Sequence, residues 1–184
     1  MSEVYVFLAD GFEEIEGLTV VDLLRRADIR VQTVSIMGRK EITGSHDIKV
    51  EADILFEEAD FAAAEMLVLP GGLPGTDHLK AHKGLQEQIL AFNSEGRQLA
   101  AICAAPTVFG ALGLLTGKKA TCYPTMEEGL TGAEVVRESA VTDGTITTGR
   151  GMGAAIDFSL RLIEILRDKR TADMTAEKIV YRRS

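Results

Sequence analysis

The chain has 184 residues, a net charge of −8 and a hydrophobic fraction of 46%, which predicts one folded domain spanning residues 1–184. The acidic balance argues against a nucleic-acid binder, which would carry a basic surplus. No apolar run approaches the roughly 20 residues that cross a bilayer, and the first residues have neither the basic segment nor the cleavage site of a signal peptide. Two cysteines are too few for a disulfide framework and predict free thiols in a reducing cytoplasm.

Short apolar runs alternate with helical patterns along the first half of the chain. The continuous apolar run over residues 4–8 predicts a strand buried on both faces. Apolar residues at helical spacing then predict a helix over 14–26, and they are Ile15, Leu18, Val21 and Leu24. We expect further strands at 30–36 and 66–69, a short antiparallel excursion within 41–55, and one helix over 78–93.

The second half of the chain repeats this alternation. A small apolar strand over 99–102 leads into Cys103 and an apolar helix that reaches about residue 115. We expect a short strand at 119–122, a strand pair at 137–141 and 145–147 around a turn, and a helix over 153–166. The polar segment 168–175 is expected to form a tail with at most one helical turn. The whole pattern predicts one α/β domain with a mainly parallel sheet and helices on both faces.

Cys103 lies where a buried strand is expected to meet a helix. A sharp turn at such a junction exposes a nucleophile, and the alanines around it are small enough for a crowded turn. The helix N-terminus would favour the thiolate, which is the reactive form. The alternative is that Cys103 is a small buried hydrophobic residue, as cysteines in apolar runs often are. Cys122, which lacks such a turn, is interpreted as structural.

Gly71 and Gly72 follow another buried strand. Glycines there allow a ligand to approach the backbone, and two N–H groups could hold an oxyanion or a carboxylate. The alternative is an ordinary tight turn. No phosphate-binding glycine motif is present in a strand–helix context.

Three carboxylates crowd the start of the first expected helix, where they would ordinarily serve the helix dipole: Glu13, Glu14 and Glu16. Glu16 differs because apolar positions bracket it, so it could act as an acid or base if it lies near Cys103. His78 and His82 have the i, i+4 spacing of a metal clamp, but their polar surroundings indicate a solvated surface. We expect no metal and no cofactor.

Four segments together resemble the ThiJ/PfpI superfamily, in particular the branch of the parkinsonism-associated protein deglycase and its bacterial relatives. They are FLADGFEEIE (7–16), LPGG (69–72), AICAAP (101–106) and TGRGMG (148–153). Their order and spread cover nearly the whole chain. The resemblance implies a flavodoxin-like three-layer sandwich and a homodimer.

The resemblance also implies a site and two kinds of function. Cys103 would be an oxidation-prone nucleophile, Glu16 a protonated carboxyl that donates to its sulfur, and Gly72 and Ala104 the oxyanion donors. The implied enzyme is a glyoxalase or deglycase that needs no cofactor and acts on methylglyoxal or its protein and nucleotide adducts. The alternative is an oxidative-stress sensor or redox-regulated chaperone that uses Cys103 without turnover.

Three positions depart from patterns in the superfamily. Ala104 stands where the protease-like branches have a histidine, which disfavours peptidase activity. Tyr123 stands where one member of the branch has a histidine, and tyrosine is a poor base near neutral pH. His46 occupies a position that often carries arginine at the dimer interface, and its role is left open by the sequence.

Overall fold

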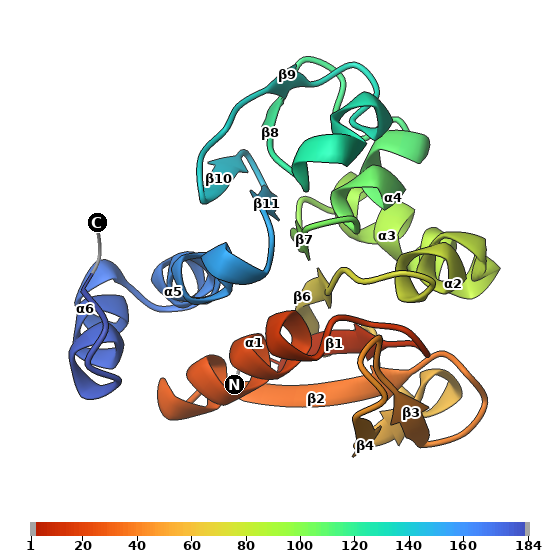
Figure 1. Ribbon diagram of the computed structural model, residues 1–184, viewed down its shortest axis with the longest axis horizontal. Helices are drawn as coiled ribbons and strands as arrows, with labels where there is room; N and C mark the ends of the chain where they lie inside the picture. Colours follow the sequence, from red (N-terminus) through yellow and green to blue (C-terminus); the bar gives the residue numbers. More distant parts are fainter. Residues whose placement is uncertain (1–2, 183–184) are drawn as a thin grey trace.

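A seven-stranded sheet forms the middle layer of the molecule, and helices cover both of its faces (Figure 1). The computed structural model describes residues 3–182. The strand order is β10-β11-β7-β6-β1-β2-β5, and every neighbouring pair is parallel except β10 and β11. The strands are β1 (Glu3–Leu8), β2 (Arg30–Ser35), β5 (Ile54–Leu55), β6 (Ala64–Leu69), β7 (Gln98–Ile102), β10 (Ala140–Asp143) and β11 (Ile146–Gly149). The predicted flavodoxin-like α/β architecture is confirmed.

The two faces of the sheet bury separate apolar cores. The first core packs beneath α1 (Glu14–Arg26), α5 (Ala155–Leu166) and α6 (Lys169–Lys178). The second packs beneath α2 (Gly75–Ala81), α3 (Lys83–Ser94) and α4 (Pro106–Ala111). Successive residues of a strand point to opposite faces, so the central strands must be apolar on both sides. All six residues of β1 are buried, in agreement with its continuous apolar pattern.

Short strands and turns connect the elements of the main sheet and its helices. The expected antiparallel excursion is the hairpin of β3 (Glu41–Thr43) and β4 (Lys49–Glu51), whereas β5 joins the main sheet. β8 (Lys119–Ala120) pairs in parallel with β9 (Glu134–Val135). Short 3₁₀ turns complete the chain, namely η1 (Phe56–Glu58), η2 (Pro124–Gly129) and η3 (Met152–Ala154). Among the described helices, none is both long enough and apolar enough to span a membrane.

The single helix expected over 78–93 is wrong, because the chain breaks at His82. This residue is extended (φ −78°, ψ 102°) and separates α2 from α3. Its Nδ1 accepts the backbone N–H of Leu85 at 3.0 Å, so His82 caps α3. Its ring also packs on Phe56, with 4.5 Å between the ring centroids. His78 and His82 therefore do not share one helical face.

The polar segment after residue 167 is also more ordered than expected. It forms the ten-residue helix α6, because Asp168 accepts the N–H of Thr171 at 2.7 Å and caps its start. Ala172 and Ala176 are buried against the first core. Small residues at helical spacing thus anchor a segment whose overall composition is polar. The helix expected to reach residue 115 instead ends at Ala111.

Gly110 illustrates how closely the segment after Cys103 is packed. A Cβ added there would lie 2.0 Å from the carbonyl oxygen of Gly129. Because this neighbour is backbone, we expect Gly110→Ala to lower the free energy of unfolding by about 3 kcal/mol. The control is Gly153→Ala, where an added Cβ would meet nothing within 4 Å. Urea denaturation of both variants measures the difference, and equal losses would contradict the expected clash.

The strand order places a topological switch point between β1 and β6. From β1 the chain builds outward through β2 on one side and through β6 and β7 on the other. Ligands of such sheets bind beyond the carboxyl ends of the strands at this point. Glu16 follows β1, Gly71 follows β6 and Cys103 follows β7. The topology therefore brings three segments distant in sequence to one place.

Candidate functional site

Cys103 occupies a strained turn between β7 and α4. Its φ is +64°, a value that side chains other than glycine adopt rarely and at an energetic cost. Two backbone hydrogen bonds of 2.9 Å hold it there, one from its N–H to the oxygen of Gly149 and one from the N–H of Tyr123 to its own oxygen. The sharp turn expected from the sequence is present, and it leaves the Cys103 side chain partly exposed.

Glu16 is fully buried in the first turn of α1 and interacts with the Cys103 side chain. Its Oε2 accepts the N–H of Gly71 at 2.9 Å. Within residues 3–182, its Oε1 has no nitrogen or oxygen partner. A buried carboxyl with one unpaired oxygen is costly unless that oxygen serves another group. The Glu16 carboxyl and the Cys103 thiol each shift the pKa of the other, so the two side chains form one unit.

The glycines after β6 leave room for this pair. A Cβ on Gly71 would lie 2.6 Å from the Cys103 Cβ and 2.6 Å from Glu16 Oε2. Gly72 has a φ of +89°, a conformation that favours glycine. The backbone N–H groups of Ala104 and Gly72 act on the Cys103 thiol and lower its pKa. The resemblance to the ThiJ/PfpI superfamily implies Gly72 and Ala104 as N–H donors. The hydrogen bond from Gly71 to Glu16 could be found only in the tertiary structure.

Burial and mutual interaction shift both titratable groups. Burial raises the pKa of Glu16 to about 7. Burial and the Glu16 carboxylate raise the pKa of Cys103 to about 12, against the lowering by the N–H groups of Ala104 and Gly72. Between these values the pair holds one proton. Because the proton can sit on sulfur or on the carboxyl oxygen without a change in net charge, the titration belongs to the pair.

The lowered thiol pKa expected from the helix N-terminus is therefore wrong for this structure. The donors lower the pKa of Cys103 as expected, but burial and the neighbouring carboxylate outweigh them. A thiolate can form at neutral pH when the thiol proton moves to Glu16. The protonated carboxyl is then neutral, so its negative charge no longer opposes the thiolate. The reactive form thus depends on Glu16 more than on α4, which has only six residues.

Glu16 predicts a pH-dependent stability. A carboxyl whose pKa is raised from 4.5 to about 7 on folding contributes stability that is fully present below pH 4.5 and is lost as the pH rises through 7. Glutamine does not ionise, so Glu16→Gln removes this loss. As the pH rises from 4.5 through 7, the free energy of unfolding of the variant should therefore increase relative to the wild type, by up to about 3 kcal/mol. Urea denaturation at several pH values measures it. The control Glu87→Gln, at an exposed position of α3, should show no such trend.

Glu13 and Glu14 have other partners. The Glu14 carboxyl is buried and accepts the N–H of His46 at 2.8 Å, and the His46 ring nitrogen Nδ1 lies 3.0 Å from its Oε2. The hydrogen bond to Glu14, followed by the charge of Glu13, raises the pKa of His46. These contacts fasten the β3–β4 hairpin to the start of α1. Glu14 thus has a structural contact that the expectation of a dipole role did not foresee.

Cys122 differs from Cys103 in its burial and in its neighbours. It is fully buried, and burial followed by the charge of Glu127 raises its pKa to about 11. No carboxyl shares its proton. Its neighbour Tyr123 is 48% exposed, and the backbone N–H of Tyr123 donates to the Cys103 oxygen.

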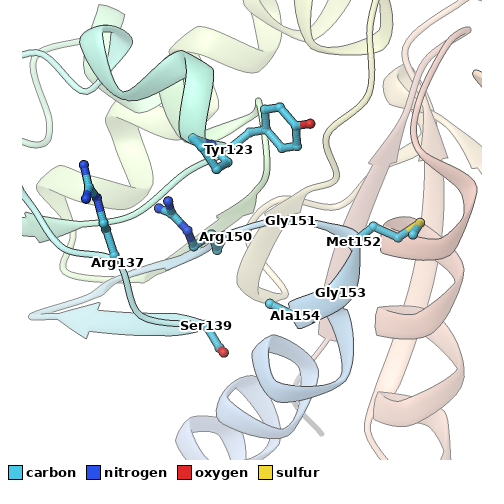
Figure 2. A pocket seen from close by; sticks show the side chains of 9 residues that line it. Tyr123, Arg137, Ser139, Arg150, Gly151, Met152, Gly153 and Ala154 are labelled. Atoms are coloured by element: carbon cyan, nitrogen blue, oxygen red, sulfur yellow. The ribbon is translucent and has the colours of Figure 1, made fainter.

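An open cleft with a volume of about 450 Å³ lies beside Tyr123 (Figure 2). Its lining residues are Tyr123, Pro124, Arg137, Ser139, Arg150, Gly151, Met152, Gly153 and Ala154. Figure 2 shows the two arginines on one side of the cleft and Met152 on the other. Sequence reasoning weighed Arg150 only as part of a glycine-rich motif and did not single out Arg137.

Comparison with known proteins identifies the fold and the family. The model of the DJ-1/PfpI family matches residues 2–165, which include Glu16, Gly72, Cys103 and Ala104. The chain belongs to the DJ-1/PfpI family. The resemblance to the ThiJ/PfpI superfamily is thereby confirmed.

Family members from distant organisms align over most of this chain. Protein DJ-1 homolog B of Arabidopsis thaliana is 38% identical over 98% of this chain and 42% of its own length. The chain thus spans less than half of that protein, but 95% of the Drosophila melanogaster protein dj-1beta, which is 33% identical. A deglycase of Thermococcus kodakarensis is 29% identical over 90% of this chain. The oxidized form of Toxoplasma gondii DJ-1 superposes with a TM-score of 0.95 over 100% of both chains, at 30% identity.

Proposed function

We propose that this DJ-1/PfpI protein is a cysteine-dependent, cofactor-independent enzyme of the glyoxalase or deglycase type. Its substrates would be methylglyoxal or the adducts that methylglyoxal forms with proteins and nucleotides. The observation that carries the proposal is the Cys103–Glu16 pair, which shares one proton beneath two backbone N–H donors. The relative from Thermococcus kodakarensis that is named a deglycase supports it.

The first step uses the form in which Glu16 holds the shared proton. The Cys103 thiolate attacks the aldehyde carbon of methylglyoxal and forms a carbon–sulfur bond, while the carbonyl electrons move to oxygen. The N–H groups of Ala104 and Gly72, which lower the pKa of the Cys103 thiol in the free protein, would stabilise this oxygen as charge develops. Glu16 then gives its proton to the oxygen, and the product is a hemithioacetal.

The second step is an internal transfer of oxidation state. Glu16, now a carboxylate, removes the hydrogen of the former aldehyde carbon as a proton and returns it to the neighbouring carbon, while the hydroxyl proton passes to the former ketone oxygen. The aldehyde carbon becomes a thioester while the ketone becomes an alcohol, so no external oxidant is needed. Water cleaves the thioester to give lactate and regenerates the thiol. A pKa of about 7 suits Glu16 to both proton transfers.

The test is lactate production from methylglyoxal by the purified, reduced protein. We expect many lactate molecules per Cys103, with no metal, nicotinamide or glutathione added. Lactate that never exceeds one molecule per site, or no lactate at all, would refute the enzymatic proposal.

A redox sensor or redox-regulated chaperone is the second candidate, supported by the solved oxidized form of Toxoplasma gondii DJ-1. In this case peroxide would oxidise the Cys103 sulfur, and the Glu16 carboxyl would donate a hydrogen bond to the resulting sulfinate. Peroxide consumption that stops after stoichiometric oxidation, together with absent lactate turnover, would favour it.

We further propose that the protein acts as a homodimer in the cytoplasm, where its thiols remain reduced. Ile15 and Leu18, which the helical pattern grouped with core residues, are 50% and 39% exposed on α1. With Ile156 and Ile179 they line an apolar groove of about 580 Å³. A second copy of the chain is the proposed occupant, because members of this family often form dimers. Light scattering should give twice the monomer mass of 19.9 kDa.

A further inference from the structure

The cleft beside Cys103 is cationic, although the chain as a whole has a net charge of −8. Arg137 and Arg150 are its charged lining residues, and no carboxylate lines it among the described residues. A positive cleft on an acidic surface concentrates anions locally. This contrast selects the cleft from the other hollows of the surface as a binding site for an anionic group.

The cleft and the nucleophile share a framework. The backbone oxygen of Cys103 accepts the N–H of Tyr123. The backbone N–H of Cys103 donates to the oxygen of Gly149, the residue before Arg150. Tyr123 and Arg150 both line the cleft. The cleft therefore lies next to the Cys103 backbone, and neither Gly72 nor Ala104 is among its lining residues.

The two arginines have different roles. Arg150 is 23% exposed, and its Nη1 bonds to the Cys122 oxygen and to Glu127 Oε1 at 3.3 Å each. Arg137 is 77% exposed, and its ion pair is between Nε and the same Glu127 oxygen, at 3.6 Å. One carboxylate thus meets two guanidinium groups, which leaves a net positive charge. Within residues 3–182, Arg137 has no other ion-pair partner, and a guanidinium fork matches carboxylate and phosphate oxygens.

The rest of the lining suits a short carbon skeleton. Tyr123 and Met152 are 48% and 51% exposed, and the glycine backbone around Gly151 lies between them along the wall of the cleft (Figure 2). Exposed aromatic and thioether side chains provide apolar contact area. Ser139 adds a hydroxyl near the charged side.

We propose that this cleft binds the non-reacting end of the substrate, and that this end carries a carboxylate or a phosphate held by Arg137. This inference rests on the proposed function, since it assigns an orientation to an aldehyde attacked by Cys103. It favours small anionic aldehydes over adducts on protein lysine or arginine side chains. Arg137 is then a specificity-determining residue that acts by binding, without a part in the proton transfers.

The test measures alkylation of Cys103 and does not require turnover. Three chloroacetyl probes have the same electrophile, namely N-chloroacetylglycine, N-chloroacetylaminomethylphosphonate and the neutral N-chloroacetylglycinamide. Site-resolved mass spectrometry gives the alkylation rate of Cys103 for each. We expect at least one anionic probe to react about 5-fold faster than the neutral one, the size expected for one exposed ion pair.

Variants assign this preference to Arg137. Arg137→Gln should bring the ratio of anionic to neutral rates to about one, Arg137→Lys should retain most of it, and the control Arg170→Gln on α6 should leave it as in the wild type. A faster carboxylate or a faster phosphonate probe identifies the anion. Equal rates for all probes in the wild type, or a preference that survives Arg137→Gln, would overturn the proposal. Absence of lactate turnover would refute the proposed function while leaving these rates interpretable.

Discussion

Replacing Cys103 by alanine should lower kcat for lactate formation from methylglyoxal by at least about 10³-fold. The proposed reaction passes through a covalent hemithioacetal on this sulfur, and no other described nucleophile shares its position at the end of β7. Steady-state kinetics with direct lactate detection measures the loss. We expect the variant to fold, because alanine keeps the Cβ and the two backbone hydrogen bonds of this turn and removes only the sulfur.

The matched control is Cys122→Ala. Cys122 is the second thiol of the chain, but it is fully buried and shares no proton with a carboxyl. Its removal should leave kcat within a few-fold of the wild-type value. If the two variants lose activity equally, a general effect of cysteine loss explains the result and the assignment of the nucleophile is wrong. If Cys103→Ala retains activity, the covalent pathway is wrong.

Glu16→Gln should reduce kcat by roughly 10²–10⁴-fold, the usual contribution of a positioned acid–base group. Glutamine can still accept the N–H of Gly71, so the local hydrogen bond survives. It can neither take the proton from Cys103 nor return it to the substrate. Glu16→Asp keeps a carboxyl on a shorter side chain, so its kcat should lie between that of Glu16→Gln and that of the wild type.

The pH profile separates a catalytic carboxyl from a structural one. Below pH 7 the wild-type pair holds two protons and is inactive, whereas above pH 7 it holds one, so kcat should rise through about pH 7. In Glu16→Gln this limb should disappear, because the group that titrates there is gone. An unchanged limb in the variant would show that another residue governs the protonation of the site.

The regular parts of the fold could be predicted because their sequence patterns are local. The helix α1 spans Glu14–Arg26 as expected from its spacing, and β1 follows its apolar run to within a residue. The turn at Gly144 also lies where expected, with a φ of +63°. Apolar patterns with a period of two or 3.6 residues indicate which face of a strand or helix is buried. Predictions made from them therefore need no knowledge of distant contacts.

The errors arose where side chains override local pattern. The helix break at His82 depends on one imidazole that caps Leu85 and packs on Phe56, and no periodicity encodes that contact. The half-exposed Ile15 and Leu18 satisfy the helical spacing equally well, but they lie outside the core. A sequence pattern shows that a face is apolar without showing what covers it.

The sequence by itself determined the α/β class, the family and the residues of the candidate site, because these are carried by local periodicity and by short motifs at strand ends. Only the tertiary structure decided how those residues act on one another. The raised pKa of Cys103 follows from its burial and from a buried carboxyl 87 positions earlier in the chain, which β1 and β7 bring to the same edge of the sheet. Electrostatic coupling depends on distance and burial in space, and neither can be read along a chain.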